Sequence, residues 1–210
     1  DMHQNIVATR VEKEEHKVSD VDSTALHEKV LKICQAIKTK TDTYEALAEY
    51  FTPEGYKQYS RLIKYGSPRV ISTDGCRYVK LGEEIQCRSI PMSFTFSKGK
   101  NQLENVVFTF NSTGKIDGVQ FALEERAARN IMGNTDIDET ARLTLVNFME
   151  NYKTAFSLQR WDYIESIFSD DAVIITGRVL QKSEQLTDAH QVSLDNVVYT
   201  RMSKTEYINR

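Results

Sequence analysis

The segment that decides the fold class is Val106-Val107-Phe108-Thr109-Phe110-Asn111-Ser112-Thr113-Gly114-Lys115-Ile116-Asp117-Gly118-Val119. Residues 106–110 and 116–123 are rich in β-branched and aromatic side chains, which favour a strand. Between them, 111–114 consists of Asn, Ser, Thr and Gly, residues typical of a tight turn. The pattern predicts two antiparallel strands joined by a turn.

The residues before this hairpin also predict strands. Ser93-Phe94-Thr95-Phe96 alternates polar and apolar side chains, as a half-buried strand does. We expect this alternation to belong to an antiparallel meander whose earlier strands span 69–72, 76–81 and 85–96.

Before Arg69 the apolar spacing changes from two residues to the spacing of helices. It predicts helices over 24–39 and 44–51, and a third that begins at Thr52-Pro53-Glu54 and stops at Gly66. We therefore predict an α+β domain in which three helices cover the concave face of a curved, cone-like antiparallel sheet. Its expected core comprises Ile33, Ile37, Leu47, Phe51, Leu62, Phe94, Phe108 and Phe121.

The second half of the chain starts a similar order of elements. We predict a polar N-terminal segment over 1–22, a complete helix-and-sheet domain over 23–132, and a second, incomplete domain of similar fold over 133–210. The elements expected after the first domain are helices over 124–132, 138–158 and 161–168, strands over 172–180 and 197–200, and a helix capped by Ser203 and Glu206.

Two short segments support a degenerate repeat. Residues 44–54 align with 161–171 at an offset of 117, which places Trp161 on Tyr44 and Phe168 on Phe51. Each segment follows a long amphipathic helix, although two ordinary amphipathic helices could share this much by coincidence.

These residues resemble the nuclear transport factor 2-like superfamily, which includes SnoaL-like, ketosteroid isomerase-like and related cystatin-like cones. The similarity lies in Phe168-Ser169-Asp170-Asp171-Ala172-Val173-Ile174 after a long and a short helix, and in the hairpin 107–119. The resemblance implies a cone with an apolar pocket at one end. Its members include enzymes and proteins that only bind or dimerise, and we find no residue that matches a general base of the enzymes. The side chains that could line such a pocket are Tyr44, Tyr50, Phe94, Phe96, Phe108 and Phe121.

The chain has three cysteines. Cys34 occupies an apolar helix position and is expected in the core. Cys76 and Cys87 flank a predicted hairpin turn, so a disulfide between them is possible. A two-residue loop at Leu81-Gly82 would place them opposite each other, whereas a three-residue loop with Gly82 in the left-handed region would not.

Composition argues against several partners and cofactors. The formal net charge is −3, and a chain without basic excess does not favour binding to a nucleic acid backbone. No apolar run approaches the length of a membrane span. His27-Glu28 begins like a zinc-protease helix, but residue 31 is Leu where a second His is needed, and no phosphate or dinucleotide loop occurs. We therefore expect no metal ion and no cofactor.

Three functional hypotheses follow. We favour a non-catalytic binding or scaffold module, with a small apolar ligand, a homodimer, or a missing C-terminal segment that completes the second domain as the expected partner. Because the chain starts at Asp1 with a polar stretch, we expect a periplasmic or secreted protein whose export signal was removed, with a cytoplasmic protein as the alternative. The second hypothesis is a small-molecule isomerase or cyclase, and the third is an adaptor that dimerises through its sheet.

Overall fold

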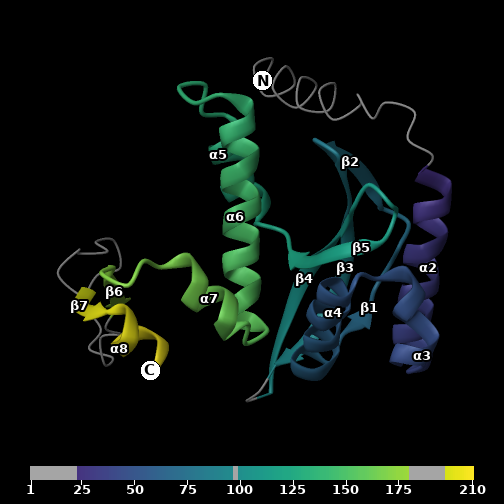
Figure 1. Ribbon diagram of the computed structural model, residues 1–210, viewed down its shortest axis with the longest axis horizontal. Coiled ribbons are helices and arrows are strands. Elements are labelled where there is room, and N and C mark those ends of the chain that lie inside the picture. Colours follow the sequence, from purple (N-terminus) through teal and green to yellow (C-terminus); the bar gives the residue numbers. More distant parts are fainter. Residues whose placement is uncertain (1–22, 97–98, 180–196) are drawn as a thin grey trace, which may run out of the picture. The chain divides into compact units, whose positions relative to one another are not determined.

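The computed structural model describes residues 23–96, 99–179 and 197–210. The predicted polar segment 1–22 lies outside the described residues. The chain divides into two compact units, residues 1–159 and 160–210. The described part consists of helices and antiparallel sheets, which confirms the predicted α+β class (Figure 1).

The helices at the start of unit 1 match the predicted ones closely. Thr52 caps α4 as its side chain accepts a hydrogen bond from the Gly55 amide at 3.1 Å, and Pro53 occupies the first turn. At the other end Ser67 adopts a left-handed conformation, with φ of 42°, and stops the helix. The elements are α2 (Ser23–Thr39), α3 (Tyr44–Leu47), the 3-10 helix η1 (Ala48–Tyr50) and α4 (Pro53–Gly66).

An antiparallel sheet follows, in the order β1-β3-β4-β5, with β2 also paired to β3. β4 starts earlier than we predicted, at Lys100, because it pairs with β3 along nearly its whole length. The predicted strand over 69–72 is shorter, since only Arg69 and Val70 pair with β3. The strands are β1 (Arg69–Val70), β2 (Arg77–Leu81), β3 (Glu84–Phe96), β4 (Lys100–Phe110) and β5 (Ile116–Phe121).

The core of unit 1 lies between this sheet and the helices α2, α3 and α4. It includes every residue of the predicted core, each at most 7% exposed. α4 approaches β5 so closely that a Cβ on Gly55 would lie 2.0 Å from the carbonyl oxygen of Ile116. Because glycine has no Cβ, Gly55 allows α4 to approach β5 this closely.

A bulge in β3 sets which side chains face this core. The register between β3 and β4 shifts between Cys87 and Ile90, and Ser89 has a φ of +67°. In a regular strand Cys87 and Ile90 would face opposite sides, but here both are fully buried in the core. Arg88 is left on the other face of the sheet, where its guanidinium contacts α6.

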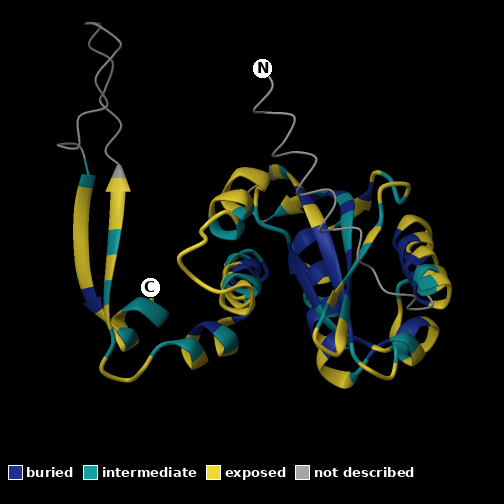
Figure 2. Cartoon of the chain, turned by 90° about the horizontal axis from the view of Figure 1, so that it is seen from above, coloured by how far each residue is buried: buried dark blue, intermediate teal, exposed yellow. Residues whose placement is uncertain are grey.

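The far face of the sheet is covered by α6 (Glu139–Ser157), which follows α5 (Glu125–Met132). Figure 2, seen from above, shows the sheet between α2 and α6, and the same arrangement is visible in Figure 1. The sequence analysis assigned α6 to a second domain that starts at residue 133. In the structure α6 belongs to unit 1, which extends to Gln159, because its buried side chains contact this sheet.

The hairpin β2–β3 differs from both of the loops we considered. Leu81 pairs with Glu84, so Gly82 and Glu83 form the loop, with a φ of +62° at Gly82. This register places Tyr78, and not Cys76, opposite Cys87. All three cysteines are free thiols, and Cys34 is buried in the core as predicted.

Unit 2 is small and contains two helices and a two-stranded sheet within the described residues. Ser203 and Glu206 form the predicted capping box at the start of α8. Phe168 packs edge-on against Tyr207 at a centroid distance of 5.7 Å. The elements are α7 (Trp161–Ile167), β6 (Val173–Val179), β7 (Val197–Ser203) and α8 (Lys204–Ile208).

Candidate functional site

The residues predicted to line a pocket differ in burial, although Tyr50 and Phe96 pack against the cluster that contains Phe94, Phe108 and Phe121. Phe94, Phe108 and Phe121 are fully buried, and the rings of Phe94 and Phe121 lie 4.9 Å apart in an edge-to-face contact. Phe96, half-buried, stacks on Phe94 at 5.7 Å. These side chains are therefore part of the packed core.

The two predicted tyrosines lie among the helices. Tyr44 is 60% exposed and its ring meets Tyr56 edge-on at 4.9 Å. Tyr50 is half-buried beneath the Lys32 ammonium, which lies 5.7 Å from the ring centre. No contact between these tyrosines and the phenylalanine group is seen among the described aromatic pairs. A shared pocket lined by these six residues stays a prediction.

Tyr59 brings the hydroxyl of a fully buried side chain into the core, and this hydroxyl has no hydrogen-bond partner among the described residues. Burial raises the pKa of Tyr59. The phenol is therefore protonated at neutral pH and can donate a hydrogen bond, but it cannot serve as a general base there.

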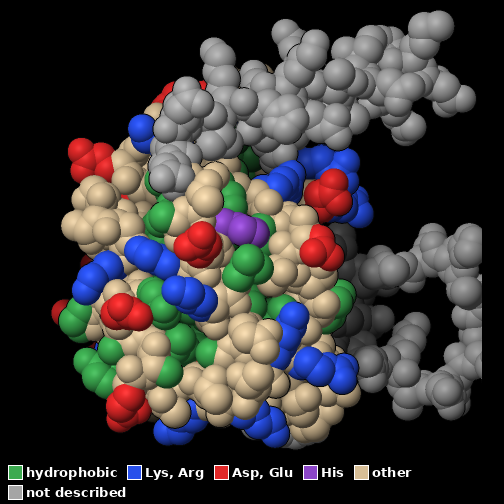
Figure 3. All heavy atoms as spheres, turned by 90° about the vertical axis from the view of Figure 1, so that its right-hand side faces the viewer, with side chains coloured by type: hydrophobic (Ala, Val, Ile, Leu, Met, Phe, Trp, Pro, Cys, Tyr) green, Lys and Arg blue, Asp and Glu red, His purple; other side chains and the backbone are tan. Residues whose placement is uncertain are grey.

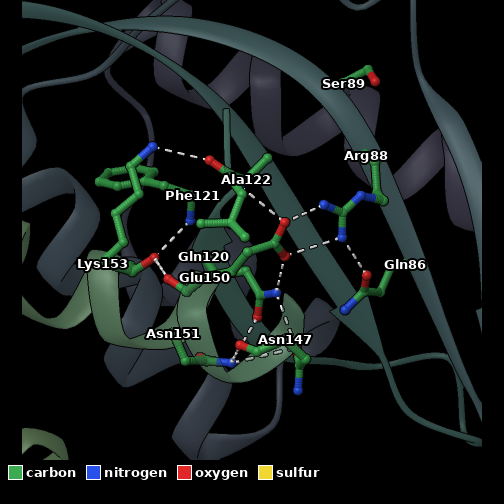
Figure 4. A network of polar contacts seen from close by, with 12 residues as sticks. Gln86, Arg88, Ser89, Gln120, Phe121, Ala122, Asn147, Glu150, Asn151 and Lys153 are labelled. Carbon is green, nitrogen blue, oxygen red and sulfur yellow. Dashed lines mark hydrogen bonds and ion pairs between the residues drawn. The ribbon is translucent and has the colours of Figure 1, made fainter. Parts of the chain in front are cut away.

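The most elaborate polar arrangement in unit 1 joins α6 to the outer face of the sheet (Figure 4). Glu150 is 0% exposed and forms a two-pronged ion pair with Arg88, one of whose bonds, Nη1 to Oε2, measures 3.1 Å. Gln120 donates to the same carboxylate at 2.8 Å, and the Leu123 amide donates to it at 3.1 Å. Both carboxylate oxygens are thus occupied, and the Arg88 charge compensates that of Glu150.

Further polar contacts extend this network on both sides. Arg88 also donates to Gln86 at 2.6 Å. Lys153 lies 2.6 Å from Glu104 and donates to the Ala122 carbonyl at 3.0 Å. These contacts attach α6 to the outer face of the sheet. Polar side chains fill this interface, whereas the interface between helix and sheet in an ordinary core is apolar.

Side chains also accept hydrogen bonds from the backbone amides along the outer edge of β5. The amides of Val119, Phe121 and Leu123, which alternate along this edge, donate to Gln58, Thr154 and Glu150 at 3.0, 2.7 and 3.1 Å. Free amides at a sheet edge are a template for pairing with another strand, and here α4 and α6 occupy them. This edge is therefore closed to strand addition.

This network was not among the predicted sites, although its polar residues follow a pattern in the sequence. A polar stripe runs along the same helix at Asn147, Glu150, Asn151 and Thr154, with the spacing of one helical face. On the strands, Gln86 and Arg88 alternate with core residues, and Gln120 lies between Val119 and Phe121. Together, these two patterns in the sequence indicate a polar contact between this helix and the sheet.

The face of α6 that meets the sheet carries Glu150 and Thr154 together with the small apolar residues Val146 and Ala155, and larger apolar side chains lie on the outer face. Leu145, Phe148 and Met149 are 39%, 42% and 37% exposed. The Phe148 ring stacks with Tyr152 at 6.2 Å. Amphipathic helices of soluble domains place these faces the other way round, so the orientation of α6 is unusual.

The surface of the described residues shows no other dominant chemistry on the face seen in Figure 3. Basic and acidic side chains are interspersed there with apolar groups. No group of three or more metal-binding side chains occurs in the described ranges. None of the described helices has the length and apolar character needed to cross a membrane.

Comparison with known proteins found no match to this chain among family models, curated proteins or solved structures. The resemblance to the nuclear transport factor 2-like superfamily, and the repeat suggested by the alignment of 44–54 with 161–171, therefore stay predictions.

Proposed function

We propose that the chain is a non-catalytic binding or scaffold module that associates with a second copy of itself through the outer face of α6. The observation that carries the binding proposal is the orientation of α6, with Glu150 fully buried and Phe148 42% exposed.

The exposed side chains have the spacing of a helix–helix contact. Leu145, Phe148 and Met149 occupy positions i, i+3 and i+4 and form one stripe along the helix. Exposed apolar groups that cluster in this way mark interaction surfaces more often than single exposed residues do. The stripe is a convex helix surface, whereas sites for small molecules are concave, so a protein surface is the better fit.

A second copy is the partner that the composition favours. The formal net charge is −3 on 210 residues, so two copies repel each other weakly. A two-fold axis through the centre of the stripe would place Phe148 of each copy beside the other and pair Leu145 with Met149. Two-fold dimers are the commonest soluble assemblies, and one patch on each copy is sufficient for them.

The polar groups favour binding over acid–base catalysis. The Glu150 carboxylate is held by Arg88, Gln120 and Leu123, so it has no oxygen free to take a proton from a substrate. Tyr59 is buried with a raised pKa. The isomerase or cyclase alternative would need another ionisable group in the core.

The test is sedimentation equilibrium of the full chain and of two variants over a range of concentrations. Phe148→Lys places a charge at the centre of the stripe and should weaken the dimer at least tenfold, which corresponds to about 1.4 kcal/mol. Ala46→Lys adds the same charge at an exposed position of α3 and should leave the dimer unchanged. A wild-type chain that stays monomeric at the highest concentration, or equal dissociation constants for the two variants, would refute the proposal.

A further inference from the structure

Thiols and aromatic side chains gather between α2 and the hairpin β2–β3. His27 and Cys34 lie seven residues apart on one face of α2. The His27 ring nitrogen Nδ1 lies 2.9 Å from the Tyr78 hydroxyl. Tyr78 is the partner of Cys87 across the hairpin, and Cys76, which directly precedes β2, packs against the same core cluster as Tyr78.

Cys87 belongs to the core cluster of unit 1 and Cys76 packs against that cluster, so the two thiols interact with each other. The hydrogen bond that Cys87 donates lowers the pKa of Cys76, and the same bond, together with burial, raises the pKa of Cys87. Tyr78, which interacts with Cys87 across the hairpin, also has its hydroxyl 2.9 Å from the His27 ring nitrogen. Polar side chains of α2 and β2 thus surround the two thiols.

The two cysteines differ in access. Cys87 is fully buried, whereas Cys76 is half-exposed and lies just before the first residue of β2. Among the described strands β2 pairs with β3 alone, so the segment at Cys76 can shift toward Cys87 without breaking a second ladder. An accessible cysteine with a lowered pKa beside a buried thiol is the arrangement of an attacking and a resolving cysteine.

Cys34 belongs to the same neighbourhood but has a different character. Burial raises the pKa of Cys34 to about 12, so it remains a thiol at neutral pH. It lines a surface hollow of about 320 Å³ together with Leu31, Lys32, Gln35, Lys38 and Thr73. Thr73, at the wall of this hollow, accepts a hydrogen bond from the Cys76 amide at 3.4 Å. The turn that carries Cys76 therefore borders the hollow.

We propose that Cys76 and Cys87 are a redox pair that a low-molecular-weight disulfide oxidises to an intrachain disulfide. The Cys76 thiolate attacks one sulfur of the oxidant, forms a mixed disulfide and releases the first thiolate, which takes up a proton. Cys87 then gives its proton to solvent and attacks the Cys76 sulfur. The mixed bond breaks and the second thiol of the oxidant leaves, so the two electrons of the pair reduce one disulfide to two thiols. The proposal does not depend on what α6 binds.

The sequence makes the product easy to identify, since trypsin places each cysteine in a separate peptide. Cys34 lies in residues 33–38, Cys76 in 70–77 and Cys87 in 81–88. We would incubate the full chain with glutathione disulfide at pH 8, block the remaining thiols, and map the peptides by mass spectrometry. The expected product joins 70–77 to 81–88, while 33–38 carries the blocking group. A bridge to 33–38, or all three peptides blocked, would overturn the proposal.

Variants assign the roles of the two cysteines. Cys87→Ala should accumulate the mixed disulfide on Cys76, whereas Cys76→Ser should leave Cys87 unmodified and lose at least tenfold in the rate of oxidant consumption. Cys34→Ala is the matched control and should form the same bridge as the wild type. A mixed disulfide on Cys87 in the Cys76→Ser protein at the wild-type rate would show that Cys76 is not the attacking thiol. The wild-type peptide map decides the proposal even if a variant at the buried Cys87 does not fold.

Discussion

Replacement of Glu150 by Gln tests whether the ion pair with Arg88 holds α6 onto the sheet. The substitution keeps the size of the side chain and removes its charge. Breaking a buried ion pair by removal of one partner costs about 3–5 kcal/mol. The Arg88 side chain is 21% exposed and keeps its bond to Gln86, so the lower end of that range applies, about 3 kcal/mol.

The loss can be measured as a shift of the thermal midpoint and of the denaturant midpoint. For a unit of this size each kcal/mol corresponds to roughly 2–4 °C, so we expect a decrease of about 6–12 °C. Urea unfolding should show a lower midpoint at an unchanged slope, because the surface exposed on unfolding is the same. Glu83→Gln is the matched control, since Glu83 lies exposed in the β2–β3 turn and its replacement should be nearly neutral.

A double-mutant cycle separates the pair from its surroundings. Glu150→Gln and Arg88→Gln should each destabilise, and the double variant should lose less than the sum, because the second change removes a charge that the first left unpaired. A loss below about 1 kcal/mol for Glu150→Gln, or strictly additive losses, would mean that the network does not hold α6 in place.

Two further substitutions test the core and the contact between helix and sheet. Leu47→Ala removes a side chain that is 3% exposed and should cost about 2–5 kcal/mol in urea unfolding; unchanged stability would place Leu47 outside the core. Gly55→Ala should cost at least about 1–3 kcal/mol, because its Cβ would lie 2.0 Å from the Ile116 carbonyl oxygen. Gly82→Ala is the comparison variant. A Cβ at Gly82, in the open turn of the β2–β3 hairpin, would have no atom within 4 Å, so its cost reports only the backbone strain at a φ of +62°. Equal losses at the two glycines would show that α4 can move away from the sheet.

The local sequence was sufficient for the elements and for the main core. The periodicity of α2 and the cap at Thr52-Pro53 depend on neighbours a few residues away, and the structure places both helices where they were predicted. The alternation at 93–96 likewise predicts a strand whose Phe94 is buried. Such features follow from backbone geometry and apolar spacing, both of which can be read from a short window.

The candidate sites depended on contacts between distant segments. The predicted pocket treated six aromatic residues as one set, but the fold places Tyr44 at an exposed helix and Phe121 in the core. The relation between Cys76 and Cys87 depended on the register of one hairpin, and a shift of a single residue in the loop changes which side chains face each other.

By itself the sequence determined the α+β class, most element boundaries of the first unit and the composition of its core, because each of these follows from local spacing and burial of apolar side chains. Only the tertiary structure decided which face of α6 is buried. An amphipathic helix is expected to bury its apolar stripe, but here the outer face of the sheet presents Arg88, Gln86 and Gln120, and the polar stripe with Glu150 is its complement. The desolvated charges are compensated only when Arg88 and Glu150, 62 residues apart, meet across two elements, and that pairing is a property of the fold.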